Sequence, residues 1–306
     1  MPNTSVSIAA VALKNPVMTA SGTCGYGEEL AGFFDLSRLG ALVVKGISVL
    51  PRPGNPPPRI VETCGGMLNA IGLQNVGFEA FVRDCLPGLR QVRTALIVNI
   101  LGESEEEYAL LAESLGGQDG VAAIEVNVSC PNVKRGGLSF GADPEALERL
   151  VRTIRTRTAR PLLVKLSPNV TDVVDMALRA EDAGADGLTL INTLRGMAID
   201  LSSRSPSLGT VVGGLSGPAI KPVALRMVWE VSRRVRIPVV GVGGILTAED
   251  ALEFLVCGAT AVQVGTAHFR SPTACIDVIE GIDAYLTAHG IGDVRELIGS
   301  LKVPGR

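Results

Sequence analysis

The sequence has few aromatic residues and no cysteine pairs at metal-binding spacing. Phe, Trp and Tyr make up 4% of the 306 residues, and the apolar residues are mostly Val, Leu, Ile and Ala, which suits a buried parallel sheet. The six cysteines stand at positions 24, 64, 85, 130, 257 and 275, and no two have C-x-x-C spacing. We therefore expect neither a metal site nor an iron–sulfur cluster on this chain. For each cysteine other than Cys130 we expect a buried apolar role.

Signals for export, membrane insertion and nucleic-acid binding are also missing. The first residues show no basic stretch followed by an apolar stretch, so we expect no signal peptide. No run of 18 apolar residues occurs, so we expect no membrane span. The net charge of −3 gives no reason to expect a nucleic acid or an anionic membrane as partner. Together with the unpaired cysteines, this predicts a cytoplasmic protein with reduced thiols.

Eight short apolar runs recur along the chain, each followed by a polar or glycine turn and then by a segment of helical period. The runs are Pro16–Ala20, Leu42–Gly46, Ala95–Ile100, Ala123–Val128, Leu162–Leu166, Gly187–Asn192, Pro238–Val242 and Ala261–Gly265. This alternation predicts an α/β fold, a single (β/α)8 TIM barrel, as one domain over residues 1–306. The alternative is an open doubly wound sheet, but the G-x-G-x-x-G turn that it needs after its first strand is absent.

Helical periodicity and long connections complete the predicted architecture. Helices are expected at Glu105–Leu115, Pro144–Thr158, Thr171–Ala183, Ile220–Val235 and Ala248–Cys257. Residues 3–14 alternate apolar and polar side chains, which predicts a β-hairpin that closes the barrel floor. Residues 50–78 and 194–217 form long connections, and such connections at the carboxyl ends of barrel strands usually build or cover a site.

Polar residues close most of the predicted strands. Strand ends in a barrel face one common site, and here they carry Ser21, Lys45, Asn99, Asn127, Lys165, Asn192 and Thr193. Lysines and asparagines that converge on an apolar barrel mouth cost free energy unless they bind a ligand. If only one such residue were present, a hydrogen-bonded cap of the chain would be a good explanation. It is a poor explanation for all of them together.

Glycine pairs follow the last two predicted strands. Barrels commonly bind phosphate with these loops and a nearby helix N-terminus. Gly243 and Gly244 would let backbone amides approach the anion, Thr247 can cap the helix that begins near Ala248, and Gly265-Thr266 supplies a second cradle. The alternative is a pair of tight βα turns, which also favour glycine. Because both adjacent loops carry the pattern, we favour phosphate.

A phosphate beside Lys165 and several side-chain amides predicts a cofactor across the barrel mouth. Flavin mononucleotide (FMN) fits, because its ring needs apolar walls, its pyrimidine edge needs hydrogen bonds, and a lysine there would stabilise the charge of the reduced form. Pyridoxal phosphate is the alternative, with Lys165 or Lys45 as the Schiff base. The sequence favours the flavin and leaves both open.

Cys130 is the candidate proton acceptor. It lies three residues beyond Asn127, in a loop that Pro131 stiffens on the catalytic face. Only two histidines exist, His268 and His289. We expect a surface role for His268, because no neighbouring acid would orient it, so neither histidine is a plausible base. The Cys130 thiolate would have to be favoured near neutral pH, by Lys45 or by a following helix.

With these residues the chain resembles class 1 dihydroorotate dehydrogenase, over nearly its whole length. The most specific motifs are Lys45-Gly46, NAIGLQN (Asn69–Asn75), NVSCPN (Asn127–Asn132) and Asn192-Thr193, together with GGLSGPAIKP (Gly213–Pro222) and GVGGI (Gly241–Ile245). The sequence after Asn192 is similar to the NAD-linked class 1B branch rather than to the fumarate-linked class 1A branch. A serine in place of Cys130 would indicate the membrane-associated class 2 branch.

The resemblance implies a role for each matching residue. FMN would contact Ser21, Lys45, Gly46, Asn99, Asn127, Lys165, Ile191, Gly217, Gly243, Gly244, Gly265 and Thr266. Substrate would contact Lys45, Asn69, Ala70, Ile71, Gly72, Leu73, Asn127, Asn192 and Thr193. Cys130 would remove the C5 proton of dihydroorotate while hydride leaves C6 for flavin N5. The product would be orotate, an intermediate of pyrimidine biosynthesis.

The class 1B resemblance also implies a partner. Electrons would pass to NAD through a second subunit that carries FAD and a [2Fe–2S] cluster, in a complex of two catalytic and two electron-transfer subunits. The chain departs from the family pattern at Cys24, where phenylalanine is usual, and at Cys64-Gly65, where Pro-Ala is usual. Both departures lie near the site loops, and neither falls on a residue with an assigned chemical role.

Other functions share parts of this pattern. Class 1A activity would use fumarate in a lone homodimer, and a related flavin enzyme would reduce pyrimidines that lack a carboxylate. A tRNA dihydrouridine synthase would want a basic face and added helices, which the net charge and the length disfavour. A non-catalytic ligand-binding barrel would be colourless, and Cys130 would be dispensable.

Overall fold

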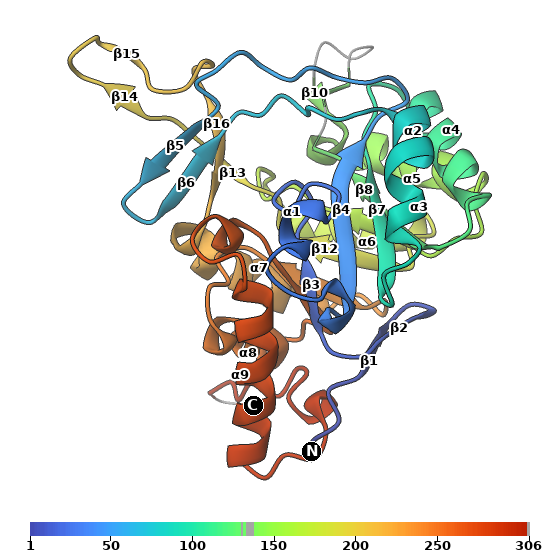
Figure 1. Ribbon diagram of the computed structural model, residues 1–306, viewed down its shortest axis with the longest axis vertical. Coiled ribbons are helices and arrows are strands. Elements are labelled where there is room, and N and C mark those ends of the chain that lie inside the picture. Colours follow the sequence, from blue (N-terminus) through green and yellow to red (C-terminus); the bar gives the residue numbers. More distant parts are fainter. Residues whose placement is uncertain (130, 133–137, 305–306) are drawn as a thin grey trace.

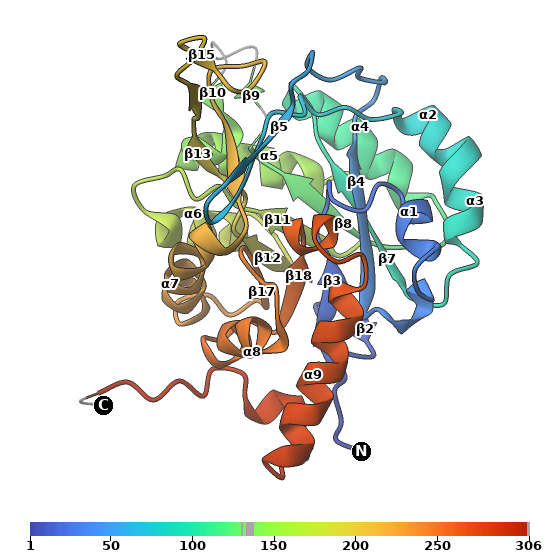
Figure 2. The same cartoon turned by 60° about the vertical axis from the view of Figure 1, so that its left-hand side comes forward.

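The computed structural model of the chain describes residues 1–129, 131–132 and 138–304. Its centre is a closed barrel of parallel strands, in the spatial order β11-β12-β17-β18-β3-β4-β7-β8 (Figures 1 and 2). The strands are β3 (Val17–Thr19), β4 (Ala41–Ile47), β7 (Ala95–Ile100), β8 (Val121–Asn127), β11 (Leu162–Lys165), β12 (Gly187–Leu190), β17 (Val239–Val242) and β18 (Ala261–Val264). All eight coincide with predicted apolar runs, so the predicted TIM barrel is confirmed.

Helices surround the barrel, and four of the longer ones begin after a side-chain cap. The longer ones are α4 (Glu105–Gly116), α5 (Pro144–Arg155), α6 (Val173–Asp182), α7 (Lys221–Ser232), α8 (Ala248–Val256) and α9 (Ala274–Ala288). Side chains of Ser104, Asp143, Asp172 and Thr247 accept hydrogen bonds from first-turn amides, which stabilises helix starts. The predicted cap at Thr247 is thereby confirmed, whereas α9 was not predicted.

Short helical segments fill the remaining turns of the chain. They are α1 (Glu28–Ala31), α2 (Phe78–Ala80), η2 (Phe81–Cys85) and α3 (Leu86–Leu89), with η1 (Leu36–Arg38), η4 (Phe140–Ala142), η5 (Pro218–Ile220), η6 (Thr266–Phe269) and η7 (Val294–Glu296). Within the described ranges, no helix is both long and apolar enough to cross a bilayer.

The predicted N-terminal hairpin closes the amino end of the barrel. It consists of β1 (Val6–Ile8) and β2 (Val11–Leu13), and its inward residues alternate with exposed ones. Ile8 packs beside Gly187, the first residue of β12. Figure 1 shows this hairpin at the end of the barrel opposite the long loops.

The two long connections form a second sheet at the carboxyl end. Strands β5 (Ile60–Thr63) and β6 (Gly66–Asn69) come from the first connection, and β13 (Leu194–Gly196) and β16 (Gly213–Ser216) come from the second. They pair in the order β13-β16-β6-β5, and the hairpin β14 (Ile199–Asp200)–β15 (Ser205–Pro206) extends outward from them (Figure 1). A further pair, β9 (Pro131–Asn132) and β10 (Leu138–Ser139), follows β8.

Candidate active site

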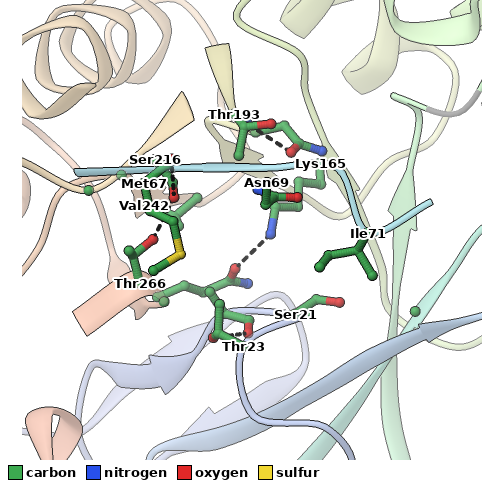
Figure 3. Close-up of a pocket in the computed structure, with 18 of the residues that line it drawn as sticks. Ser21, Thr23, Met67, Asn69, Ile71, Lys165, Thr193, Ser216, Val242 and Thr266 are labelled. Atoms are coloured by element: carbon green, nitrogen blue, oxygen red, sulfur yellow. Dashed lines mark hydrogen bonds between the residues drawn. The ribbon is translucent and has the colours of Figure 1, made fainter. Parts of the chain in front are cut away.

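A cavity of about 340 Å³ lies at the carboxyl ends of the barrel strands, against the four-stranded sheet (Figure 3). This volume falls in the range of small-molecule sites. Its walls include every predicted site residue that the structure describes: Ser21, Lys45, Gly46, Asn69, Ala70, Ile71, Gly72, Leu73, Asn99, Asn127, Lys165, Ile191, Asn192, Thr193, Gly217, Gly243, Gly244, Gly265 and Thr266. The predicted base, Cys130, lies outside the described residues.

The cavity has both polar and apolar walls. Asn99, Lys165 and Gln263 come from inside the barrel and are buried. Met67, Leu101 and Val242 supply apolar surface. A flat heteroaromatic ring with one hydrogen-bonding edge is complementary to such a combination, because apolar faces need apolar contact and the polar edge needs donors and acceptors.

A hydrogen-bonded polar layer crosses the barrel beneath this cavity. Glu125 is wholly buried, and its carboxylate accepts hydrogen bonds from Asn99 Nδ2 at 2.8 Å and from Gln263 Nε2 at 2.6 Å. Thr189 Oγ1 donates a third bond at 3.0 Å. Glu125 and Gln263 were not predicted as site residues. The signal for Glu125 was its place two residues before Asn127, since alternate residues of a strand share one face.

Lys45 carries the second ammonium of the site. It differs from Lys165 in its partners, because Lys165 lies 3.8 Å from the Glu125 carboxylate. Burial lowers the pKa of Lys45, and the Cys24 thiol and Glu29 oppose the shift only in part. Within the part of the chain that the structure describes, its ammonium makes no hydrogen bond or ion pair. A partly desolvated cation without a counter-ion is costly, so an anionic ligand would be stabilised beside the half-buried Lys45.

Backbone geometry supports the predicted phosphate cradle. Gly243 and Gly244 have φ of 133° and 77°, and a Cβ on Gly244 would lie 2.7 Å from Cβ of Lys221. Among the hydrogen bonds of the described residues, none engages the amide of Gly244. The amides of Leu246 and Thr247 instead donate to the Asp250 carboxylate. Among the described residues the Gly244 amide is therefore available to an anion, whereas the Leu246 and Thr247 amides are already engaged.

The sheet above the cavity brings together residues far apart in sequence. Thr266 Oγ1 donates to Ser216 Oγ at 2.8 Å, and Asn69 Nδ2 donates to the Gly214 carbonyl at 3.2 Å. A Cβ on Gly214 would lie 2.2 Å from Oγ1 of Thr193, so β16 can pass this close only as glycine. Figure 3 shows Thr193, Ser216, Met67 and Asn69 along one side of the cavity, opposite Ser21 and Thr23.

Two expectations about side chains near the site were wrong. His268 is buried rather than on the surface, because η6 turns it inward, and its Nε2 lies 3.2 Å from Cys275 Sγ. Burial lowers the pKa of His268 to about 4. Cys64 is exposed rather than a buried apolar residue, because it sits in the turn between β5 and β6.

The burial of the other described cysteines is closer to the expected buried apolar role. Cys24 and Cys275 are buried, whereas Cys85 and Cys257 are half-buried. Burial raises the pKa of the Cys24 thiol to about 11, and Sγ donates to the Val43 carbonyl at 3.4 Å. Within the described residues, no cluster of His, Cys, Asp and Glu could hold a metal ion.

Comparison with known proteins identifies the family. A family model described as dihydroorotate dehydrogenase matches residues 3–286. The chain belongs to the dihydroorotate dehydrogenase family. A member from Geotalea uraniireducens, named dihydroorotate dehydrogenase B (NAD(+)), catalytic subunit, is 60% identical over 300 residues, which cover 98% of each chain.

Other members of the family carry the same name. The protein from Geobacter sulfurreducens is 59% identical over 302 residues, 99% of each chain. The one from Pelobacter propionicus is 59% identical over 301 residues, 98% of this chain and 99% of its own. The resemblance to the NAD-linked branch of the dihydroorotate dehydrogenases is therefore confirmed.

Proposed function

We propose that this chain is the catalytic subunit of an NAD-linked dihydroorotate dehydrogenase, which oxidises dihydroorotate to orotate in pyrimidine biosynthesis. The observation that carries the proposal is the convergence of all the described predicted residues on one cavity, in a chain of this family. The two lysines and six side-chain amides that line this cavity offer enough polar groups for a flavin together with a carboxylated pyrimidine.

FMN would lie across the barrel mouth. Gly217, Gly243, Gly244, Gly265 and Thr266 would hold its phosphate through backbone amides, and Lys165 with Asn99 and Asn127 would face its polar edge. Ser21, Lys45, Gly46 and Ile191 would complete its contacts. When bound, FMN supplies the acceptor for the hydride that leaves C6 of dihydroorotate.

The chain's own groups would bind the substrate and take its proton. Lys45 would pair with the carboxylate, and Asn69, Asn127, Asn192 and Thr193 would hydrogen-bond the ring. The loop Ala70–Leu73 would cover it from the side of β6. Cys130 would remove the proton at C5, adjacent to a carbonyl, for which a thiolate is a suitable general base.

A partner subunit would carry FAD and a [2Fe–2S] cluster and pass the electrons to NAD, in a complex of two subunits of each kind in the cytoplasm. The reason for a partner is that no cluster ligands are encoded on this chain. Copurification from the native source, followed by iron and flavin analysis, tests this part. A lone homodimer that turns over fumarate would contradict it in favour of class 1A activity.

The proposal is tested most directly on the purified chain. We expect a yellow protein that releases FMN on denaturation and whose flavin is bleached by dihydroorotate under anaerobic conditions. Dihydrouracil, which lacks the carboxylate, should bleach it far more slowly. A colourless protein that takes up no FMN, or equal reduction by both compounds, would overturn the assignment.

A further inference from the structure

Glu125 is a buried carboxylate beneath the candidate flavin site, and the proposed function gives it no role. It lies in β8, two residues before Asn127, so both side chains point into the barrel. Glu125 is fully inaccessible to solvent. A carboxylate in such a place is tolerated only when it is paired with a cation and hydrogen-bonded.

Three donors from three different strands satisfy this carboxylate. Asn99 comes from the adjacent β7 and Thr189 from β12. Gln263 comes from β18, which does not neighbour β8 in the barrel, so its hydrogen bond spans the barrel interior. The position of Glu125 is therefore determined from several sides at once.

The only cation that the described residues bring within ion-pair distance of Glu125 is Lys165. Its Nζ lies 3.8 Å from Glu125 Oε1 and donates to Gln263 Oε1 at 3.4 Å. Gln263 thus bridges the pair, since its amide nitrogen donates to the carboxylate and its amide oxygen accepts from the ammonium. Lys165 lines the cavity, whereas Glu125 lies below it.

We propose that Glu125 is a positioning residue, the permanent counter-ion that holds the Lys165 ammonium charged and in place whether bound FMN is oxidised or reduced. The inference rests on the proposed FMN site. Without the carboxylate, Lys165 would have a counter-ion only when the flavin is reduced. Reduction by two electrons would then be coupled to the uptake of one additional proton by Lys165.

Other titratable groups that face this layer do not provide the same charge. Lys45 reaches the cavity from β4, and it is itself a cation. The Cys24 thiol donates to the Val43 carbonyl of β4, and burial raises its pKa to about 11, so it is neutral near pH 7. Within the described ranges, Glu125 is the anion of this layer.

The first test compares bound FMN in the wild-type protein and in Glu125→Gln. We expect the midpoint potential of the variant to fall more steeply with pH over roughly pH 6 to 9, by one proton per two electrons. FMN should also bind about tenfold more weakly, because the ammonium is less well held. The matched control is Thr189→Val, which removes a hydrogen bond from the same carboxylate but no charge, and should keep the wild-type slope. Equal slopes in Glu125→Gln and wild type would overturn the proposal.

The second test needs no flavin and follows urea unfolding of the apoprotein. Glu125→Gln and Lys165→Met should each lower the unfolding midpoint, and the double variant should lose less than the sum of the two, because no unpaired buried charge remains. Additive losses would overturn the pairing. If Glu125→Gln does not fold, a folded double variant supports the pairing and an unfolded one overturns it. If the unfolding midpoints of the apoprotein variants show that Glu125 and Lys165 are coupled but the protein binds no FMN, only the proposed function is contradicted.

Discussion

The side-chain amide of Asn192 donates one hydrogen bond to Asn127 Oδ1 at 3.1 Å and another to Ser129 Oγ at 2.9 Å. Asn127 Oδ1 also accepts from the Ser129 amide at 3.1 Å, and Tyr108 donates its hydroxyl to the Asn127 carbonyl at 2.5 Å. The segment after β12 is therefore hydrogen-bonded to Ser129, which immediately precedes position 130 in the sequence. The side chains of Asn127 and Asn192, which we propose bind substrate, and Ser129 are parts of one hydrogen-bonded unit.

Asn192→Ala should weaken orotate binding by about tenfold, because it removes two hydrogen bonds that hold the half-buried Asn127 and Ser129 side chains in place. Titration of the flavin absorbance with orotate measures the effect. Ser129→Ala is the matched variant, since it loses only one of the two bonds and should change the affinity less. Unchanged affinity in Asn192→Ala would contradict a role for this unit in substrate binding.

Cys130→Ser should keep FMN and orotate binding but slow flavin reduction by dihydroorotate by at least about 10²-fold, since a hydroxyl is a far weaker base than a thiolate. Anaerobic stopped-flow absorbance gives the rate. Cys64→Ser changes an exposed thiol in the β5–β6 turn and should reduce at the wild-type rate. A wild-type rate in Cys130→Ser would exclude the thiol as the base.

Orotate affinity should fall as the pH rises through the pKa of Lys45. Burial holds this pKa below the usual lysine value, and only the protonated amine attracts the carboxylate, so binding is strongest below that pKa and is lost above it. The measurement is the dissociation constant as a function of pH. Lys45→Met should bind weakly with a flatter profile, whereas Lys14→Met, at the barrel floor, should keep the wild-type profile. A wild-type profile in Lys45→Met would assign the pH dependence to another group.

The stability of the fold should fall on acidification because of His268. Its pKa is about 4 in the folded protein against a usual 6.5, so the unfolded chain binds more protons in this window. The contribution is fully present above pH 6.5 and is lost as the pH falls toward 4, and it amounts to about 3 kcal/mol. Urea unfolding at several pH values should show a smaller acid loss in His268→Phe. If the wild type and His268→Phe lose the same free energy of unfolding on acidification, His268 is not the cause of that loss.

Much of the barrel could be predicted because its signals are local. Apolar runs mark the strands, and polar caps such as Thr247 mark helix starts, since both depend on residues close in sequence. Strand-end polar residues could be assigned to one site without contacts, because parallel strands in a barrel all end at the same face. The proposed roles of Lys45, Asn127 and Lys165 began from that rule.

Contacts between distant segments could not be predicted in the same way. The pairing of β6 with β16 depends on two long connections meeting above the barrel, and no local periodicity encodes their register. His268 was assigned to the surface because its partner, Cys275, lies on the next helix and its burial depends on how η6 packs against α9.

The sequence by itself determined the barrel, the face that carries the site and the residue types available there, because period, glycine and capping patterns act over a few positions. Only the tertiary structure decided which polar groups meet. Glu125 in β8 reaches Gln263 in β18 across the barrel, and Asn192 reaches Asn127 and Ser129 at its mouth. Closure of the sheet creates these distances, and the energies of buried charges and hydrogen bonds depend on them.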